Sequence, residues 1–349
     1  MDRKIFFLLI ILINQFYFSQ SKVLSKIDNL ETTLEVESFI RSQSKDKRDY
    51  LSQFELRTIE RFDDNNLSRK IKRFADSLGI NKSFYKGDFN HDGRTDLIFI
   101  GDDKSCQSSQ KNSDGTNSCN TSTKVFFDLG NTYILKNLQP NHSDFVIPVI
   151  SKINDQDYIT VFFEEFTEDL EASTFRYNSK IISKTLDYKF DNFVEYNPYP
   201  TSHFIQKIEY STDMCYGTCP MFNIVLNKNG RSTFIAKAFN FIDNNNPRSQ
   251  EKAYKALNKN RNEGSFKAQL NVEDFAKIET ILNYINFSNL SDSYFVNWTD
   301  DQTSNLKITY NNGEVKTIED YGLSGTYGLK LLYKKLFDIR FNQEWKKIK

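Results

Sequence analysis

Short runs of aromatic and β-branched residues, separated by polar turns, recur after Gly79. Runs of this length and composition are typical of strands in an antiparallel sheet. In chain order they are residues 96–101, 124–129, 133–135, 145–150, 158–163, 175–177 and 185–190. Before Gly79 the pattern is helical instead, with one apolar face formed by Leu67, Ile71, Phe74 and Leu78. We therefore predict a first domain of the α+β class over residues 20–196, with helices ahead of the sheet.

A second domain is predicted over residues 205–349. Residues 197–204 contain Pro198 and Pro200, which disfavour helix and central strand alike, so this segment is the predicted linker. Beyond it the patterns are a strand at 205–210, a hairpin turning at Asn229-Gly230, a polar loop over 239–264 with a short helix at 250–257, a helix after Asn271, a hairpin turning at Asn312-Gly313, and a last helix. The order ββ-α-ββ-α predicts an antiparallel sheet covered by helices, again of the α+β class.

The only apolar run near membrane length stands at the start of the chain. Arg3 and Lys4 precede an unbroken apolar stretch at residues 5–13, and polarity returns from Asn14, which is the layout of a secretory signal. An uncleaved anchor helix is the alternative, but a membrane span needs about twenty apolar residues. We therefore predict a signal peptide over residues 1–19, export to the periplasm, cell envelope or exterior, and no transmembrane span in the mature chain.

The charges of the chain balance, because 46 Lys and Arg residues stand against 46 Asp and Glu residues. Nucleic-acid binding depends on an excess of basic side chains that neutralise phosphates. A nucleic-acid partner is therefore not expected.

The segment over residues 87–97 carries oxygen-bearing side chains at alternate positions around a tight turn at Gly93. A hard cation such as Ca²⁺ takes about six to eight oxygen ligands, and alternate positions of such a loop point toward one centre. An EF-hand is not indicated, because Phe99 occupies the position of its closing Glu. The spacing points the side chains of Asp88, Asn90 and Asp92 toward one centre, and Arg94 would contribute its backbone carbonyl.

This segment resembles the calcium loops of FG-GAP and VCBS-type repeats, in which the pattern D-x-N-x-D-G-x-x-D-L leads into a strand. The resemblance implies that Asp88, Asn90, Asp92, the Arg94 carbonyl and Asp96 are the ligands of a structural Ca²⁺ ion. It implies no β-propeller, because such folds need several copies of the loop and the chain has one. A metal-free turn is the alternative, with the same side chains accepting hydrogen bonds from backbone N–H groups.

Export makes disulfides the first interpretation of the four cysteines. Local pairing would join Cys106 to Cys119 and Cys215 to Cys219, although four cysteines allow three connectivities. Two alternatives for Cys215 and Cys219 are weaker, because a zinc site would need a second ligand pair and thiol redox chemistry favours C-x-x-C spacing. We expect the bridges to order loops rather than to hold the fold together.

Residues 214–220 read Met-Cys-Tyr-Gly-Thr-Cys-Pro and lead into a strand. Together with residues 300–303, 316–322 and 340–345, they resemble a domain-of-unknown-function family of secreted Gram-negative bacterial proteins with the signature C-[FY]-G-T-C-P. The resemblance spans most of residues 205–345. It implies an exported bacterial protein and no particular activity.

Two further patterns have structural explanations. Gly322, Gly325 and Gly328 lack the Lys-Ser/Thr pair of a phosphate loop, so we predict a turn in which Thr326 caps the last helix. The acidic run that begins at Glu164 lacks ligand spacing, and a solvated loop is expected there. No catalytic set is visible, so catalytic residues are unknown.

These features favour an exported structural or interaction protein with a protein or glycan ligand over an enzyme. The alternative is an extracytoplasmic, hydrolase-like enzyme with a site at the domain interface. Its acid and base groups would come from Asp300, Asp301 or Asp320, together with Tyr321.

Overall fold

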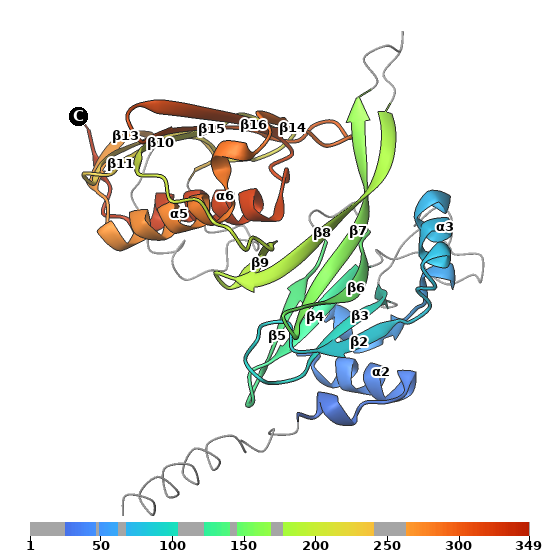
Figure 1. Cartoon of the computed structure of the whole chain (residues 1–349). Coiled ribbons are helices and arrows are strands. Elements are labelled where there is room, and N and C mark those ends of the chain that lie inside the picture. Colours follow the sequence, from blue (N-terminus) through green and yellow to red (C-terminus); the bar gives the residue numbers. More distant parts are fainter. Residues whose placement is uncertain are drawn as a thin grey trace, which may run out of the picture. The chain divides into compact units, whose positions relative to one another are not determined.

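The structure is a computed structural model that describes residues 25–46, 49–61, 68–103, 122–139, 145–168, 177–240 and 263–348. The predicted signal peptide, the cysteines at 106 and 119 and the short helix at 250–257 lie outside these ranges. The chain divides into two compact units (Figure 1). The first comprises Met1–Asn137 with Ile150–Tyr158, and the second Leu138–Val149 with Ile159–Lys349.

The first unit places one helix against an antiparallel sheet. The order of the sheet is β1-β3-β4-β5, with β2 also pairing with β3. Its strands are β1 Phe54–Leu56, β2 Phe84–Gly87, β3 Asp96–Asp103, β4 Ser122–Asp128 and β5 Tyr133–Asn137. Its helical segments are η1 Ile27–Asn29, α2 Thr33–Ser42, η2 Tyr50–Gln53, η3 Ile59–Arg61 and α3 Arg69–Ser77.

Helix α2 begins with a reciprocal cap and packs with its apolar face inward. The Thr32 side chain accepts a hydrogen bond from the Glu35 N–H, and the Glu35 carboxylate accepts the Thr32 N–H. Val36, Phe39 and Ile40 are buried against the sheet. The ring of Phe39 meets that of Phe126 edge to face, at 5.8 Å between centroids.

A further antiparallel sheet has the order β6-β7-β8-β9. Its strands are β6 Ile147–Ile153, β7 Gln156–Glu168, β8 Tyr177–Lys189 and β9 Asn192–Glu195. Two expectations are corrected here. The strands predicted at 175–177 and 185–190 fall, within the described residues, on the single strand β8, at Tyr177 and at 185–189, and the acidic run begins inside β7 instead of in a loop. Glu164 and Glu165 lie between Phe163 and Phe166 and pair with residues of β8, so cross-strand pairing makes this acidic segment a strand.

The second unit is built on an eight-stranded sheet with the order β14-β16-β15-β10-β11-β12-β13-β17, in which only the β14–β16 pair is parallel. Its strands are β10 Ile205–Thr212, β11 Met221–Asn227, β12 Arg231–Ala238, β13 Gly264–Gln269, β14 Ser293–Tyr294, β15 Thr303–Tyr310, β16 Glu314–Tyr321 and β17 Lys346–Lys347. Alternate residues of β11 and β12 are buried, as a sheet with one covered face requires.

Two helices, α5 Val272–Tyr284 and α6 Tyr327–Asn342, cover one face of this sheet (Figure 1). η5 Phe287–Asn289 follows α5. Asn271 caps α5 by accepting the Glu273 N–H, and Thr326 caps α6 by accepting the Leu329 N–H. Phe222, Phe234, Tyr210 and the apolar faces of both helices form one core. The predicted α+β class is confirmed, and β13, β14 and β17 extend the predicted ββ-α-ββ-α order.

The division into units differs from the boundary predicted at residues 197–204. This segment hydrogen-bonds to the end of α5, where Thr201 and His203 both donate their N–H groups to Asn283. Val194 of β9 lies in the core of the second unit. The prolines therefore mark an extended segment that is fastened to the second unit.

Glu195, the last residue of β9, binds the first turn of α6. Its two carboxylate oxygens accept the Tyr327 N–H at 2.8 Å and the Gly328 N–H at 3.0 Å. The N–H groups of a first helical turn have no partner within the helix, and the helix dipole favours a negative charge there. This contact holds the β8–β9 strands on the second unit.

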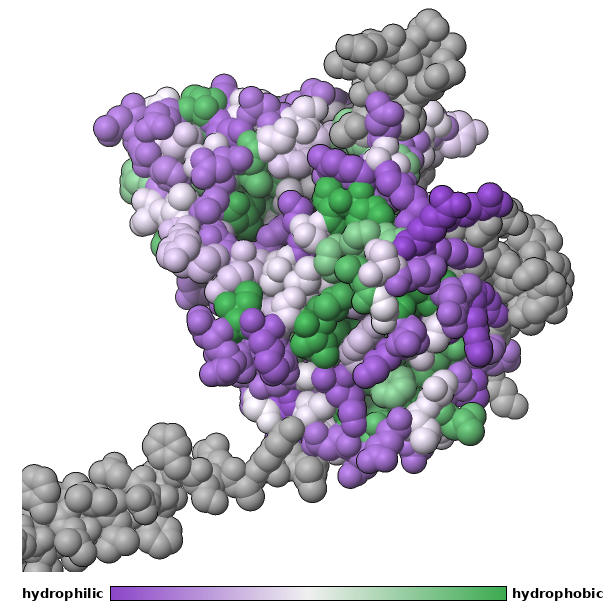
Figure 2. Space-filling model, turned by 45° about the vertical axis from the view of Figure 1, so that its right-hand side comes forward, coloured by the Kyte–Doolittle hydropathy of each residue, from purple (hydrophilic) through white to green (hydrophobic). Residues whose placement is uncertain are grey.

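No helix within the described ranges is long and apolar enough to cross a membrane. The face of the molecule in Figure 2 is mostly hydrophilic, with apolar residues gathered in several patches. Single exposed apolar residues need no explanation, whereas patches beside a cavity can mark a binding surface.

Replacing Glu195 with Ala should lower the free energy of unfolding of the second unit by about 1–3 kcal/mol, because the two amides lose charged acceptors. Denaturant titration followed by tryptophan fluorescence measures this change. Glu344→Ala, at an exposed site, is the control. Equal stabilities of the two variants would contradict the role assigned to Glu195.

Candidate functional site

The predicted calcium loop lies between β2 and β3 of the first unit and folds back on Asp88. The Asp88 carboxylate accepts the N–H groups of Asp92, at 3.0 Å, and Gly93, at 2.8 Å. The Asn90 side-chain oxygen also accepts the Asp92 N–H, at 3.2 Å. Oxygens from Asp88 and Asn90 thus converge on one amide group, and the Asn90 amide donates to Asp92 Oδ2 at 3.1 Å.

Asp96 is arranged differently from the other predicted ligands. It is completely buried, and its two oxygens accept the N–H groups of Phe89 and Asp128, both at 2.9 Å. Burial raises the pKa of the Asp96 carboxyl to about 7, although those N–H groups oppose the rise and the charges of Asp92 and Asp88 add to it. Asp96 therefore supports the base of the loop.

Asp157, at the start of β7, forms hydrogen bonds with the acidic loop. The Asp157 carboxylate accepts the Asp88 N–H, and His91, at a positive φ of 60°, places Nε2 2.9 Å from the Asp157 carbonyl oxygen. In the part of the chain that the structure describes, no three His, Cys, Asp or Glu side chains lie close enough together to hold a metal ion by themselves. Calcium here would depend on the amide oxygen of Asn90 and on main-chain carbonyls as well.

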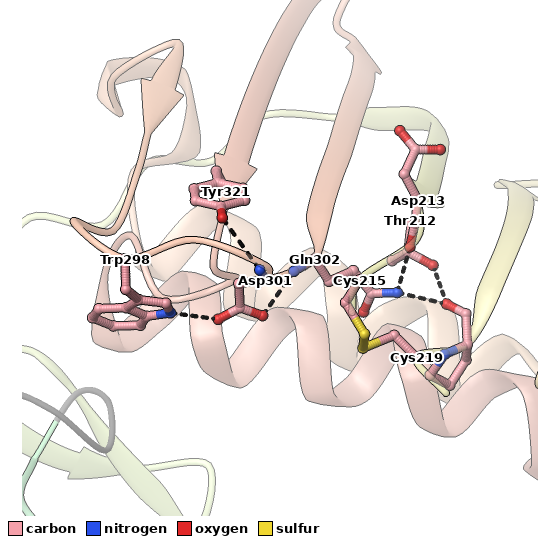
Figure 3. The surroundings of a disulfide bond; sticks show 9 residues. Thr212, Asp213, Cys215, Cys219, Trp298, Asp301, Gln302 and Tyr321 are labelled. Atoms are coloured by element: carbon pink, nitrogen blue, oxygen red, sulfur yellow. Dashed lines mark hydrogen bonds between the residues drawn. A yellow bond between two sulfur atoms is a disulfide. The ribbon is translucent and has the colours of Figure 1, made fainter. Parts of the chain in front are cut away.

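In the second unit, three of the segments that carry the family resemblance, 214–220, 300–303 and 316–322, meet at one end of the eight-stranded sheet. Cys215 and Cys219 form a disulfide that closes the loop between β10 and β11 (Figure 3). Gln302 is buried, and its Nε2 donates to the Asp213 carbonyl at 2.7 Å and to the Pro220 carbonyl at 2.8 Å. Gln302 therefore fastens both ends of the disulfide loop to β15.

Asp301 is held beside Gln302 by three contacts (Figure 3). Its carboxylate accepts the Trp298 indole N–H at 3.0 Å and the Gln302 N–H at 2.7 Å. Its own N–H donates to the Tyr321 hydroxyl oxygen at 3.2 Å. Both carboxylate oxygens are thus occupied by neighbouring donors, which suits a structural role.

A cavity of about 310 Å³ lies beside this cluster, and Trp298 lines it. Residues 163–166 of β7 and residues 293–298 form its sides, and Asp320, Ser324 and Gly325 also line it. The Asp320 carboxylate accepts the N–H groups of Ser324 and Gly325. Burial raises the pKa of this carboxyl, partly offset by these two N–H groups.

Behind Asp320 lie three buried hydroxyl groups, those of Tyr210, Tyr333 and Ser304. None makes a hydrogen bond of good geometry, and the two tyrosine rings stack at 5.5 Å between centroids. Burial raises the pKa of both tyrosine hydroxyls, and the negative charge of Asp320 adds to the rise. The N–H groups of Ser324 and Gly325 and the nearby Tyr333 hydroxyl favour the ionised form of Asp320, and burial opposes it.

Of the residues considered for an enzyme, the structure places Asp320 alone at the cavity. Asp301 is committed to Trp298, and Asp300 is exposed at a positive φ of 69°. Thr326 is the helix cap predicted for the glycine-rich turn. Sequence reasoning missed Glu195 and Asp157, because their partners are distant main-chain groups that leave no local pattern.

Residues 206–340 match the family model described as Domain of unknown function (DUF6438). The match runs from β10 into α6, so it includes the disulfide loop, Gln302 and Asp320. It agrees with the predicted resemblance of the C-terminal half to a domain-of-unknown-function family. No curated protein and no solved structure matches the chain.

Replacing Cys215 and Cys219 together with Ser should lower the free energy of unfolding by about 2 kcal/mol, as expected for a short closed loop. Gln302→Leu should lower the free energy of unfolding by about 2 kcal/mol, because the Asp213 and Pro220 carbonyl groups lose their hydrogen-bond donor. Denaturant titration measures both changes. Thr218→Ala, inside the loop and exposed, is the control, and unchanged stability in the double Ser variant would refute the bracing role.

The stability of the second unit should depend on pH through Asp320. The pKa of Asp320 is raised in the native state above its ordinary value of 3.8. At pH values between the ordinary pKa and the raised pKa, the native state therefore binds more protons than the unfolded chain. The contribution of Asp320 to the free energy of unfolding therefore falls as the pH rises from the ordinary pKa to the raised one. Asp320→Asn cannot ionise, so its stability relative to the wild type should increase as the pH rises above about 4. A stability difference that does not vary with pH would contradict the expectation.

Proposed function

We propose that this chain is an exported bacterial protein that acts by binding a partner, with a calcium-stabilised loop in its first unit and a disulfide-braced second unit. The observation that carries the binding function is the commitment of its carboxylates. Asp88, Asp96, Asp301 and Asp320 each accept main-chain N–H groups. Groups fixed in this way shape surfaces, and they are poorly placed to exchange protons with a substrate.

The proposed calcium ligands are side-chain oxygens of Asp88, Asn90 and Asp92 and the carbonyl of Arg94, with Asp96 supporting the loop from below. The donor set fits a hard cation, because it is all oxygen and the Asp88 and Asn90 oxygens already converge on the Asp92 amide. When bound, Ca²⁺ would supply positive charge that offsets the carboxylates of the half-buried Asp88 and the exposed Asp92. The ion would be structural.

The export signal at residues 1–19 and the bridge between Cys106 and Cys119 belong to the same proposal. An oxidising compartment favours the Cys215–Cys219 disulfide that the second unit contains. We infer further that the Cys-Tyr-Gly-Thr-Cys-Pro segment is the signature of this domain family. Its closed loop is fastened by Gln302, which comes from another of the resembling segments.

A hydrolase-like function is the second candidate, and one observation favours it. Asp320, whose pKa is raised by burial, lines the same cavity as Glu164 and Glu165. A carboxyl group whose pKa is raised by burial, in a cavity with other carboxyl groups, is an arrangement found in many acid catalysts.

Calcium should raise the melting temperature of the mature chain. At a free Ca²⁺ concentration about ten times the dissociation constant, the stabilisation is about 1.4 kcal/mol, and extracellular sites of this kind have dissociation constants of about 10⁻⁴ to 10⁻³ M. Differential scanning calorimetry with Ca²⁺ or EDTA measures the shift. Asp92→Ala should abolish it and Asp76→Asn, an exposed site on α3, should keep it. Identical melting of the wild type in Ca²⁺ and EDTA would refute the calcium loop.

A further inference from the structure

A second cavity of about 460 Å³ adjoins the one beside Trp298. The two cavities share the lining residues Phe163, Glu165, Ser291, Tyr294, Ser324 and Gly325. Together they form one groove, here called the hairpin groove, lined by residues of the β7–β8 hairpin and of the segment 291–298. Volumes of this size take ligands much larger than a single ion.

Side-chain contacts hold β8 and β9 against α5 and α6. Glu195 binds α6, and the Tyr284 hydroxyl donates to the Asp187 carboxylate of β8 at 2.9 Å. The rings of Phe190 and Tyr284 meet edge to face at 5.5 Å. The groove is therefore bounded by elements that the same unit holds in place.

Aromatic side chains dominate the groove. Those that line its first cavity are Phe163, Phe166, Tyr294, Phe295 and Trp298. Phe295 is 41% exposed, so part of its side chain lies at the surface of the cavity that it lines. Aromatic faces attract apolar side chains and also Lys and Arg, through the negative face of the ring.

The charges in the groove have mainly one sign. Glu164, Glu165 and Asp320 line the first cavity, whose lining includes no Lys or Arg, and Lys184 is the basic residue of the second. Glu165 forms an ion pair with Lys180 at 2.9 Å. The Lys180 side chain is largely exposed, so it can move aside when a ligand binds. Burial raises the pKa of Tyr294, and the charges of Glu195, Asp320 and Glu165 add to the rise, as expected where carboxylates surround a group.

We propose that the hairpin groove binds an extended segment of a partner protein that carries Lys or Arg side chains. This inference rests on the proposed binding function and names its partner. Cationic side chains are attracted both by the carboxylates and by the aromatic faces, whereas a neutral glycan gains no charge attraction. β14 is the edge strand of the sheet, where an extended chain can add main-chain hydrogen bonds.

The test uses the whole mature chain and fluorescein-labelled peptides of alternating Lys and Ser, with Glu-Ser and acetyl-Lys-Ser peptides of equal length for comparison. Fluorescence anisotropy at low salt should show saturable binding of the Lys peptide, weaker binding of the acetylated one, and none of the Glu peptide. Added salt should weaken the binding. Equal binding of all three peptides, or none of the Lys peptide, would overturn the proposal.

Variants then locate the site. The double variant Glu164→Gln and Glu165→Gln should lower the affinity for the Lys peptide about tenfold. Phe295→Ala should also lower this affinity. The controls are Glu319→Gln and Phe204→Ala, exposed residues outside the groove lining, which should bind as the wild type does. Melting temperatures confirm that each variant folds. Unchanged affinity in the folded double Gln variant would overturn the proposal.

Two further outcomes separate this inference from the proposed function. Saturable binding of a neutral oligosaccharide such as chitohexaose, without binding of the Lys peptide, would overturn the peptide assignment and keep the binding function. The calcium response depends on Asp92 in the first unit, so it is measured independently of the groove. Hydrolysis of the Lys peptide, abolished by Asp320→Asn, would overturn the binding function and support the enzyme.

Discussion

The second unit depends on the contact between the Glu195 carboxylate and the first amides of α6. A helix N-terminus leaves N–H groups without partners, and a carboxylate satisfies them while meeting the positive end of the helix dipole. Because β9 pairs with β8, and β8 with β7, the contact also positions the long hairpin. The hairpin groove depends on this contact, because β9 of the four-stranded sheet caps α6, the helix that covers the eight-stranded sheet.

The same chemistry recurs at two further carboxylates that are buried, whereas the buried Asp102 pairs with the buried Arg57 at 3.1 Å. Asp96 accepts two amides beneath the acidic loop, and Asp320 accepts two at the turn before α6. A buried negative charge needs compensation, and main-chain amides in tight turns supply it without a buried Lys or Arg. Such carboxylates make loops rigid, which favours recognition by a preformed surface.

Periodicity predicted the regular parts of the fold well. The alternation around Phe222 and Phe234 gave the hairpin, and Asn271 and Thr326 cap their helices as their positions indicated. Strands with weak patterns, such as β13 and β14, were missed, because their pairing partners and not their own composition make them strands. The strands around 175–190 were divided in two, since a long exposed ribbon alternates polar and apolar residues unevenly.

Local spacing was enough to single out the acidic loop, the disulfide pair and the α+β class, since these depend on residues close together in the chain. Only the folded chain could bring Gln302 to the Asp213 and Pro220 carbonyls, or β7 to Trp298 across the groove. Contacts of this kind join main-chain atoms and side chains about a hundred residues apart. A carbonyl or an amide is present at nearly every residue, so no pattern of letters reveals which one a distant side chain will meet.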